Sequence, residues 1–483
     1  MNKLKKHVSL FPATTKPADP ARLAIAYRQV RLAPPDPDAR LALATELMRA
    51  KRFDLVRRHL RRSVDFAPPD WPGGVKAGNL LFRVGDAVGA TDAYRAASTH
   101  AANDGRALWA LAAIQHKFGD RSIAQQLLVH GARVRPVNRP REHDPEKPTI
   151  LRLRSVDGNK MRMRRNPETG LCTRQLTGGH FSVNDLFDRK NFNLYIANLT
   201  AGTMPDTTSI PSIDIVINAI GCPDKNPAGL RQAAALIDSL PSLPVINHPA
   251  NVLRTTRAEN ARRLNSLPGV TFPRTKCVEY DGPPQETAFR IEALGLGYPL
   301  ILRIPGTQTG ETVELVHDRD GVAAYLSAHE ADRSVYAIEY VDCRGPEGFY
   351  HKTRAFFLGG QIYPVANLTS NTWEIHSANR DRVMMDHKWM REREMAYLKD
   401  PRAWLGVDNF NGLNAIGDMI GLDFLGIDFT VLPSGRLIVF EANAAMRHNF
   451  DYATAFPYTR PHLERISAAF EKMLMERVQS PLN

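Results

Sequence analysis

Two carboxylates stand inside apolar sequence near the end of the chain, in the segment FLGIDFTVLPSGRLIVFEAN at residues 424–443. Asp428 lies in one apolar run and Glu441 in the next, with a Pro-Ser-Gly-Arg turn between them, so we predict a two-stranded hairpin. Residues two apart on a strand face the same side, and Asn443 therefore projects with Glu441. Two carboxylates and an amide oxygen form an all-oxygen site suited to Mg²⁺ that bridges nucleotide phosphates. Carboxylates in apolar strands are costly unless they are paired or bind metal, which favours this interpretation.

Basic residues and a glycine-rich loop precede the hairpin. The apolar run YPLILR ends at Arg303, and the loop Gly306-Thr307-Gln308-Thr309-Gly310 follows it. Backbone N–H groups of such a loop can cover phosphates during transfer. Lys352 and Arg354 alternate along HKTRAFFLGG, which places two cations on one strand face. A solvated strand face is the alternative interpretation of these two residues.

The order of these segments resembles the ATP-grasp superfamily, whose catalytic domain ends in a G-x-D strand, a turn and an [FL]-E-x-N strand. The matching residues are Gly426-Ile427-Asp428 and Phe440-Glu441-Ala442-Asn443. The 13-residue step from Asp428 to Glu441 fits the D-alanine ligase type. The resemblance runs through the second half of the chain, and it implies that Asp428, Glu441 and Asn443 hold the metal.

The resemblance also implies a nucleotide site. Ile338-Glu339-Tyr340-Val341 is similar to the hinge strand that grips adenine through its backbone, with Glu339 and the next residues near the base and ribose. Arg257 and Arg303 stand where the family usually has phosphate-contacting lysines. The residues that the resemblance implies for ATP binding are Arg257, Arg303, Gly306, Thr307, Thr309, Gly310, Glu339, Tyr340 and Val341.

The sequence departs from the family pattern in two ways. Arginine keeps the charge of the replaced lysines but is not geometrically equivalent to lysine. Several ligases carry an arginine two positions before the metal aspartate to support the reaction intermediate, and Gly426 stands there in this chain. The candidates for that role are Lys352, Arg354, Arg447 and His448, of which we predict Arg354, Lys352 and Arg447 as catalytic. The polar run ending at His376 and the segment 446–449 are expected to line the acceptor site.

The mechanism that the resemblance implies is an ADP-forming ligation. A carboxylate attacks the γ-phosphate of ATP, with two Mg²⁺ and flanking cations neutralising the developing charge, and an amine then attacks the acyl phosphate. The acid and the amine are small molecules or parts of a peptide. The alternatives are an ATP-grasp phosphotransferase acting on a small molecule and an inactive nucleotide-binding scaffold. The intact metal set argues against the scaffold, while the two arginine replacements leave it open.

The first third of the chain repeats with a period of 34 residues. Lys51, Gly85 and Gly119 are 34 residues apart, and Pro34 and Pro68 have the same spacing. Each unit is predicted to form two amphipathic helices, which loosely resembles the tetratricopeptide repeat, because the Trp and Tyr positions of that pattern are mostly absent. Such stacks bind an extended peptide or a protein along a groove. A spacer or dimerisation surface is the alternative.

The positive charge belongs to the same third of the chain. The net charge is +12, and residues 1–140 hold 24 Lys and Arg against 11 Asp and Glu. The remaining residues hold 39 against 40. This distribution argues against a general nucleic-acid-binding enzyme and favours an acidic peptide or protein partner of the repeat module. A solvated basic surface without a specific partner is the alternative.

A chain of 483 residues is too long for one ordinary core, so several domains are expected. Strand–helix–strand alternation after residue 148 predicts a parallel sheet, and the strands beyond about residue 275 are more typical of an antiparallel sheet. The predicted fold class is α plus α/β: helical repeats, a pre-ATP-grasp α/β domain and an ATP-grasp (α+β) fold. The predicted parts are an extension at 1–19, repeats at 20–136, a linker at 137–148, the pre-ATP-grasp domain at 149–250 and the ATP-grasp domain at 251–480.

The remaining features are typical of a soluble cytoplasmic protein. No run approaches the roughly 20 apolar residues of a membrane helix. The basic N-terminus is followed by a short apolar run broken by Pro12, which is atypical of a signal peptide. The four cysteines lie far apart, without metal-type spacing, and are interpreted as thiols in a reducing compartment. A homodimer is among the assemblies that the ATP-grasp resemblance implies.

Overall fold

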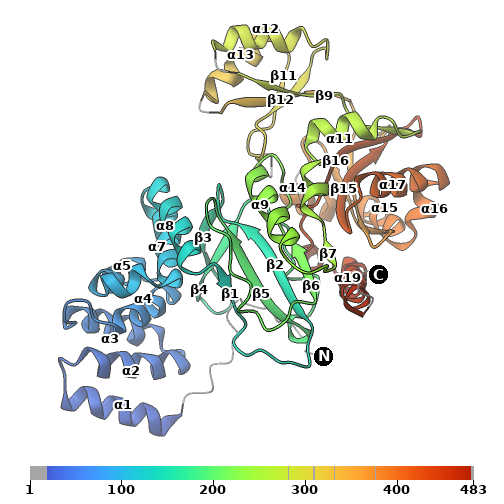
Figure 1. Ribbon diagram of the computed structural model, residues 1–483. Coiled ribbons are helices and arrows are strands. Elements are labelled where there is room, and N and C mark those ends of the chain that lie inside the picture. Colours follow the sequence, from blue (N-terminus) through green and yellow to red (C-terminus); the bar gives the residue numbers. More distant parts are fainter. Residues whose placement is uncertain (1–18, 281, 308–309, 331, 376, 480–483) are drawn as a thin grey trace. The chain divides into compact units, whose positions relative to one another are not determined.

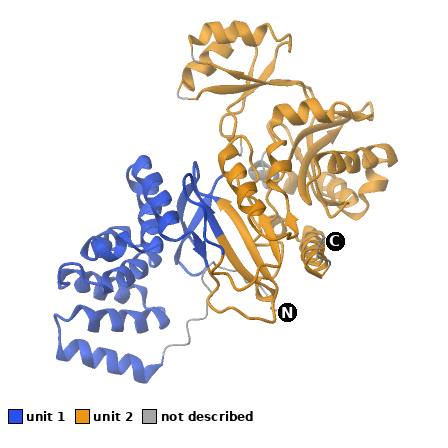
Figure 2. Cartoon of the chain, in the orientation of Figure 1, with its two compact units in different colours: residues 1–138, 155–178, 197–207 blue, residues 139–154, 179–196, 208–483 orange. Residues whose placement is uncertain are grey.

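The computed structural model describes residues 19–479 except 281, 308–309, 331 and 376 (Figure 1). The chain divides into two compact units (Figure 2). Unit 1 consists of residues 1–138, 155–178 and 197–207, and unit 2 consists of residues 139–154, 179–196 and 208–483. None of the helices in the described residues is long and apolar enough to cross a bilayer.

Unit 1 is built mainly from helices that pack in pairs. Helices α2 and α3, α4 and α5, and α7 and α8 lie against each other, where the 34-residue period predicts helix pairs. Lys51 and Gly85 both have positive φ, at 56° and 84°, so the inter-helix turn repeats its backbone conformation one period later. The assignment to the tetratricopeptide family stays a prediction. The helices are α1 (Pro20–Leu32), α2 (Pro37–Arg49), α3 (Phe53–Asp65), α4 (Gly73–Arg83), α5 (Ala87–Ala96), α6 (Ser98–Ala102), α7 (Gly105–Phe118) and α8 (Arg121–Val134).

A β-hairpin that the sequence did not predict also belongs to unit 1. Strands β3 (Lys160–Arg165) and β4 (Cys172–Thr177) pair antiparallel and pack on α4 and α7. The side chains of Met161 and Cys172 join the hydrophobic core of the helices. The hairpin lies inside the predicted 149–250 domain, so that stretch of sequence contributes to both units. The two-residue strand β1 (Val137–Asn138) ends the first segment of unit 1.

The sheet that holds the predicted parallel strands lies largely in unit 2. Its five strands have the order β1, β5 (Asn193–Leu199), β2 (Thr149–Ser155), β6 (Ile215–Asn218) and β7 (Val245–Ile246). Strand β1, residue 155 and residues 197–199 are assigned to unit 1. Strand β6 is parallel to both β2 and β7, and α9 (Pro227–Asp238) connects β6 to β7, as the strand–helix–strand pattern predicts. The connecting elements that follow are α10 (Pro249–Leu253) and α11 (Arg257–Leu264), and a 3₁₀ helix at Arg189–Asn191 precedes β5.

A small antiparallel sheet follows, in the order β11-β10-β12-β9. Its core contains Val278, Leu302 and Val335 from the strands and Ile291 and Leu326 from two helices. The alternation of buried and half-buried residues along LILR gives β10 one face toward this core. The elements are β9 (Thr275–Glu279), α12 (Pro284–Glu292), β10 (Leu300–Arg303), β11 (Glu314–Val316), α13 (Arg319–Ala328) and β12 (Ser334–Glu339).

The last sheet contains the predicted hairpin and has the order β14-β13-β15-β16-β8. Strand β13 pairs antiparallel with β14 and with β15, and β15 pairs antiparallel with β16. The strands are β8 (Val270–Thr271), β13 (Tyr350–Leu358), β14 (Gln361–Ser370), β15 (Phe424–Val431) and β16 (Leu437–Asn443). Helices α14 (Ser377–Asp386), α15 (Lys388–Lys399), α16 (Pro401–Leu405) and α17 (Val407–Ile420) connect β14 to β15. Helix α18 (Tyr452–Ala455), a 3₁₀ helix at Pro457–Thr459 and α19 (Arg460–Gln479) end the described chain.

Candidate functional site

Three charged residues form one row across the last sheet. In the strand register Arg354 of β13 lies opposite Asp428 of β15, and Asp428 lies opposite Glu441 of β16. Register shifts follow Arg354 in the β13–β14 pairing and Asp428 in the β15–β16 pairing, so both residues stand at irregularities of the sheet. Bulges of this kind re-aim side chains and are frequent beside functional sites.

The first pair in this row is a two-pronged ion pair. Nε of Arg354 donates to Oδ1 of Asp428 at 2.7 Å, and Nη2 donates to Oδ2 at 2.8 Å. The Asp428 side chain is 4% exposed and the Arg354 side chain 18%. Nζ of Lys352 lies 3.9 Å from Oδ2 of Asp428. Arg354 and Lys352, both predicted as catalytic, therefore lie at the predicted metal ligand.

The pKa of Asp428 follows from these contacts. Burial alone would raise the pKa of this carboxyl group, but the charge and the hydrogen bonds of Arg354, with the charges of Lys352 and Arg257, outweigh burial and lower it below its usual range. Asp428 is therefore an ionised carboxylate inside the protein. Burial lowers the pKa of Lys352, and the charge of Asp428 opposes that shift. Nζ of Lys352 also donates to the carbonyl oxygen of Ile375 at 2.6 Å.

Glu441 and Asn443 occupy the more open end of the row. Nδ2 of Asn443 donates to Oε1 of Glu441 at 2.6 Å, and the Asn443 amide oxygen accepts from the N–H of Ala445 at 2.8 Å. The Glu441 side chain is 34% exposed. Within the described residues no cluster of three or more His, Cys, Asp and Glu side chains is placed to hold a metal ion. The predicted set contains two carboxylates and one amide, and these oxygens are donors that suit Mg²⁺.

Arg257 approaches the same row from the start of α11. Its Nη2 lies 3.6 Å from Oε1 of Glu441, and its Nη1 donates to the carbonyl oxygen of Phe440 at 2.5 Å. Burial lowers the pKa of Arg257 despite the opposing charge of Glu441, and Arg303 contributes to the lowering. The predicted phosphate-contacting arginine 257 and the predicted metal ligand Glu441 are therefore neighbours.

Arg303 ends β10, directly before the glycine-rich loop. Its guanidinium donates to the carbonyl oxygen of Thr307, and the Thr307 hydroxyl donates to the carbonyl oxygen of Ile304 at 2.6 Å. Gly306 and Gly310 both have φ of 75°, a conformation that glycine adopts without strain. The predicted residue Thr309 and its neighbour Gln308 lie outside the described residues. Charges of Arg257 and Arg303 act on the same carboxyl group, Asp224, which indicates that the two arginines face one region.

Asp224 and Tyr336 are two residues of this region that sequence reasoning missed. The Tyr336 hydroxyl, on β12, donates to Oδ1 of Asp224 at 2.7 Å. Burial raises the pKa of Asp224, while the Tyr336 hydrogen bond and the charges of Arg257 and Arg303 oppose that shift. Asp224 lies in the Gly-Cys-Pro-Asp loop beyond the carboxyl end of the parallel strand β6. Loops at that edge of open α/β sheets often bind ligands, and this rule is the signal that points to Asp224.

The predicted hinge residues follow β12. Glu339 accepts from the N–H of Arg274 at 3.1 Å and pairs with its guanidinium at 3.3 Å. The Tyr340 hydroxyl lies 3.4 Å from the Tyr350 hydroxyl, and the Tyr340 ring meets Trp373 edge to face. The carbonyl oxygen of Val341 accepts from the Cys343 thiol at 3.3 Å.

Two further candidates come from the segment 446–449. The Arg447 side chain is 60% exposed and pairs with Asp451 at 3.6 Å. His448 is buried, with Nε2 at 3.0 Å from the Ser467 hydroxyl, and burial lowers its pKa to about 4. A neutral histidine enclosed by Phe356 and Phe450 is part of the core. The candidate His376 lies outside the described residues.

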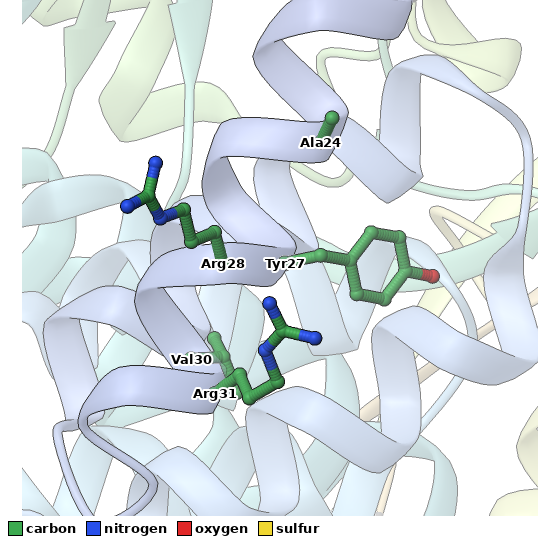
Figure 3. Close-up of a pocket in the computed structure, with 5 residues that line it drawn as sticks. All are labelled: Ala24, Tyr27, Arg28, Val30 and Arg31. Atoms are coloured by element: carbon green, nitrogen blue, oxygen red, sulfur yellow. The ribbon is translucent and has the colours of Figure 1, made fainter.

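A separate basic surface covers α1 and α3 of unit 1. Tyr27, Arg28 and Arg31 project from α1 beside a pocket of about 530 Å³ (Figure 3). Arg58 and Arg62 are exposed on α3. His59 lies between them in the sequence, its ring meets Tyr27 edge to face, and burial with the charges of Arg40, Arg62 and Arg58 lowers its pKa. The "α1–α3 basic surface" denotes Arg28, Arg31, Arg58 and Arg62.

Several solved structures are similar to this chain, whereas no protein-family model and no curated protein matches it. The D-alanine–D-alanine ligase of Bacillus anthracis has a TM-score of 0.38 at 13% identity, covering 68% of this chain and 99% of that chain. The D-alanyl-alanine synthetase A of Vibrio cholerae has a TM-score of 0.41 at 13% identity, over 69% and 98%. An ATP-grasp protein with a RimK domain from Sphaerobacter thermophilus has a TM-score of 0.39 at 13% identity, over 67% and 99%.

Proposed function

We propose that this chain is an ATP-dependent ligase that activates a carboxylate as an acyl phosphate and joins it to an amine. The observation that carries the proposal is the row of Arg354, Asp428 and Glu441, which lie opposite one another on three adjacent strands. Asn443 is hydrogen-bonded to Glu441 and completes an oxygen donor set. Binding of a charged ligand explains a row of acidic and basic side chains in a sheet better than stability does, because buried ion pairs bring little net stabilisation.

The chemistry of the donors suits Mg-ATP. Glu441 and the amide oxygen of Asn443 would hold Mg²⁺, with Asp428 beside them, and the ion would draw negative charge from the phosphates. Arg257 and Arg303 supply positive charge for the same phosphates, and Arg303 is hydrogen-bonded to Thr307 of the glycine-rich loop. Arg354 and Lys352 would neutralise charge that develops as the carboxylate oxygen attacks the γ-phosphorus and ADP leaves.

The second step needs an amine close to the acyl phosphate. The amine nitrogen attacks the acyl carbon, phosphate leaves, and the nitrogen loses a proton to give a neutral amide. The motif match to the D-alanine ligase type, through the 13-residue step from Asp428 to Glu441, favours this acceptor over a hydroxyl group. A phosphotransferase would use the same nucleotide site but would leave the phosphoryl group on its acceptor.

The experiment combines the full chain with Mg-ATP and a cell extract depleted of proteins, followed by mass spectrometry. A ligase yields ATP-dependent products whose masses equal the sum of two extract components less water. A phosphotransferase yields products heavier than one component by a phosphoryl group. Absence of any product that requires both ATP and the wild-type chain, compared with the Glu441→Gln variant, would contradict the enzymatic proposal.

We further propose that unit 1 recruits an acidic peptide or protein that carries one of the substrates. Arg28, Arg31, Arg58 and Arg62 make no ion pair with any described residue, and burial together with the charges of Arg40, Arg62 and Arg58 lowers the pKa of His59. Residues 1–18 hold four lysines and no acidic residue, so their charge disfavours them as the ligand of this surface. An acidic segment offers the complementary charge, and Tyr27 offers an aromatic contact beside it.

A further inference from the structure

The guanidinium group of Arg354 lies directly against the carboxylate of Asp428. Each of its two donating nitrogens faces a different carboxylate oxygen, at 2.7 and 2.8 Å, so the guanidinium lies across the whole carboxylate. Because the two residues are direct neighbours in the β13–β15 register, the sheet itself brings them together. The two parallel N–H donors of an arginine guanidinium, here called its fork, fit the two oxygens of a carboxylate better than the donors of any other side chain do.

The backbone of Arg354 is held by a hydrogen bond as well. The hydroxyl of Tyr397, a fully buried residue of α15, donates to the Arg354 carbonyl oxygen at 3.0 Å. This hydrogen bond lies at the register shift between Arg354 and Ala355. The arginine is thus anchored at its main chain and at its guanidinium, which favours a stable position over a transient one.

The two ends of the row differ in what they offer to a divalent ion. The Asp428 carboxylate contacts the Arg354 guanidinium and lies 3.9 Å from the Lys352 ammonium. A divalent cation at this carboxylate would therefore be repelled by two positive side chains. Glu441 is 34% exposed, and the guanidinium of Arg257 lies 3.6 Å from its carboxylate. Asn443 accompanies Glu441, within hydrogen-bonding distance. Oxygen donors open to a metal ion therefore lie at the Glu441 end.

We propose that Arg354 replaces one of the two divalent ions expected of such an ATP site, and that the chain binds ATP with a single Mg²⁺ held by Glu441 and Asn443. The inference rests on the proposed binding of Mg-ATP at this row. The fork uses two of the five N–H donors of arginine, so donors remain for a phosphate oxygen. Arg354 then supplies the positive charge near Asp428 that a second ion would otherwise supply.

The test counts Mn²⁺ ions, as a paramagnetic probe for Mg²⁺, on the full chain saturated with a non-hydrolysable ATP analogue. Electron paramagnetic resonance of free Mn²⁺ gives the number bound per chain. One ion per bound nucleotide is the expected result. Two ions would overturn the single-ion inference while leaving nucleotide binding intact, and absence of nucleotide binding would overturn the proposed function itself.

A variant pair identifies the residue responsible. Arg354→Met removes the fork and should raise the count from one Mn²⁺ to two, because Asp428 becomes available. Lys352→Met is the matched control: it also removes a cation near Asp428 but keeps the fork, and its count should stay at one. If the Arg354→Met variant still binds one Mn²⁺, Arg354 is not what keeps a second ion away, and the proposal is wrong. If Arg354→Met does not fold, Arg354→Gln, which also removes the charge and the fork, takes its place, with the same expected count of two.

Discussion

Gly426 and Met446 are in direct contact: a Cβ atom built on Gly426 would lie 2.3 Å from Cβ and 2.4 Å from Sδ of Met446. Gly426 precedes Asp428 by two residues and lies opposite Asn443 in the β15–β16 register. The side chain of Met446 therefore fills the space that a side chain at position 426 would need. An arginine side chain therefore has no room at position 426, and the cation beside Asp428 comes from another strand, as Arg354 does.

Gly426→Ala should destabilise the protein by about 1–3 kcal/mol, the usual cost of overpacking a core. Met446→Gly in the same chain removes both the Cβ and the Sδ that the new methyl group would meet, so a double-mutant cycle measured by denaturant unfolding should give a coupling of about 1 kcal/mol or more. Gly412→Ala in α17 is the control, because its nearest neighbours would lie at 3.4 Å and alanine favours a helix. Equal effects of the two glycine substitutions would argue against a close Gly426–Met446 contact.

His448 should make the protein less stable in mild acid. Its folded pKa of about 4 is below its ordinary value of 6.5, so the unfolded chain binds a proton that the native chain excludes. The resulting loss of stability begins as the pH falls below about 6.5 and approaches about 3 kcal/mol near pH 4. His448→Gln removes this titration, so wild type and variant should converge in melting temperature between pH 7 and pH 4.5. A constant difference across that range would contradict a buried neutral imidazole.

Asp224→Asn should tighten the binding of an ATP analogue by about threefold to tenfold. The carboxylate acts on Arg257 and Arg303, and it competes with phosphate for their charge. Asparagine keeps an acceptor for the Tyr336 hydroxyl, so the local contact is preserved. Glu279→Gln makes the same change of charge at an exposed position of β9 and should leave the Kd unchanged. Calorimetric titration measures the Kd of both variants. Weaker binding of the analogue by the Asp224→Asn variant would contradict a competition between Asp224 and phosphate for the two arginines.

Arg58→Glu combined with Arg62→Glu should abolish binding of a fluorescent oligoglutamate peptide to the chain. The peptide carries no sequence information, so its affinity reports charge complementarity with the α1–α3 basic surface and should fall with added salt. Arg95→Glu with Arg121→Glu changes the net charge equally on other helices of unit 1. If both double variants lose binding to the same extent, the attraction belongs to the whole basic unit and no local site exists.

Much of the fold is predictable from the sequence because local patterns and tertiary packing agree there. The 34-residue period gives the helix pairs, and the apolar runs give the strands of the two antiparallel sheets. The hairpin β3–β4 was not predicted because KMRMRR and CTRQLT have few apolar residues, and the Met161 and Cys172 side chains bury themselves only against the helices. Helices α14 and α15 were not predicted either, since their segments carry a mixed, strongly charged pattern.

The site was predictable only where its residues share a motif. Asp428, Glu441 and Asn443 belong to one predicted hairpin, and its register places the two carboxylates opposite each other. The bidentate contact of Arg354 with Asp428 joins residues 74 positions apart, and the contact of Tyr336 with Asp224 joins residues 112 positions apart. No local spacing encodes such pairs. Arg447 and His448 follow the motif closely in sequence, and spacing alone does not show that the Arg447 side chain pairs with Asp451 or that His448 contacts Ser467.

Mg²⁺ and a non-hydrolysable ATP analogue should stabilise the chain through Glu441, and melting of the loaded chain measures this directly. Ligand at about 100 times its Kd should add about 2.7 kcal/mol to the stability of the wild type and raise its melting temperature by a few degrees. Glu441→Gln, at a 34% exposed side chain that the fold tolerates, should lose most of that rise, and Glu314→Gln on the exposed edge of β11 should keep it. A wild-type chain that shows no rise, or a Glu441→Gln variant that shows the full rise, would contradict the central claim.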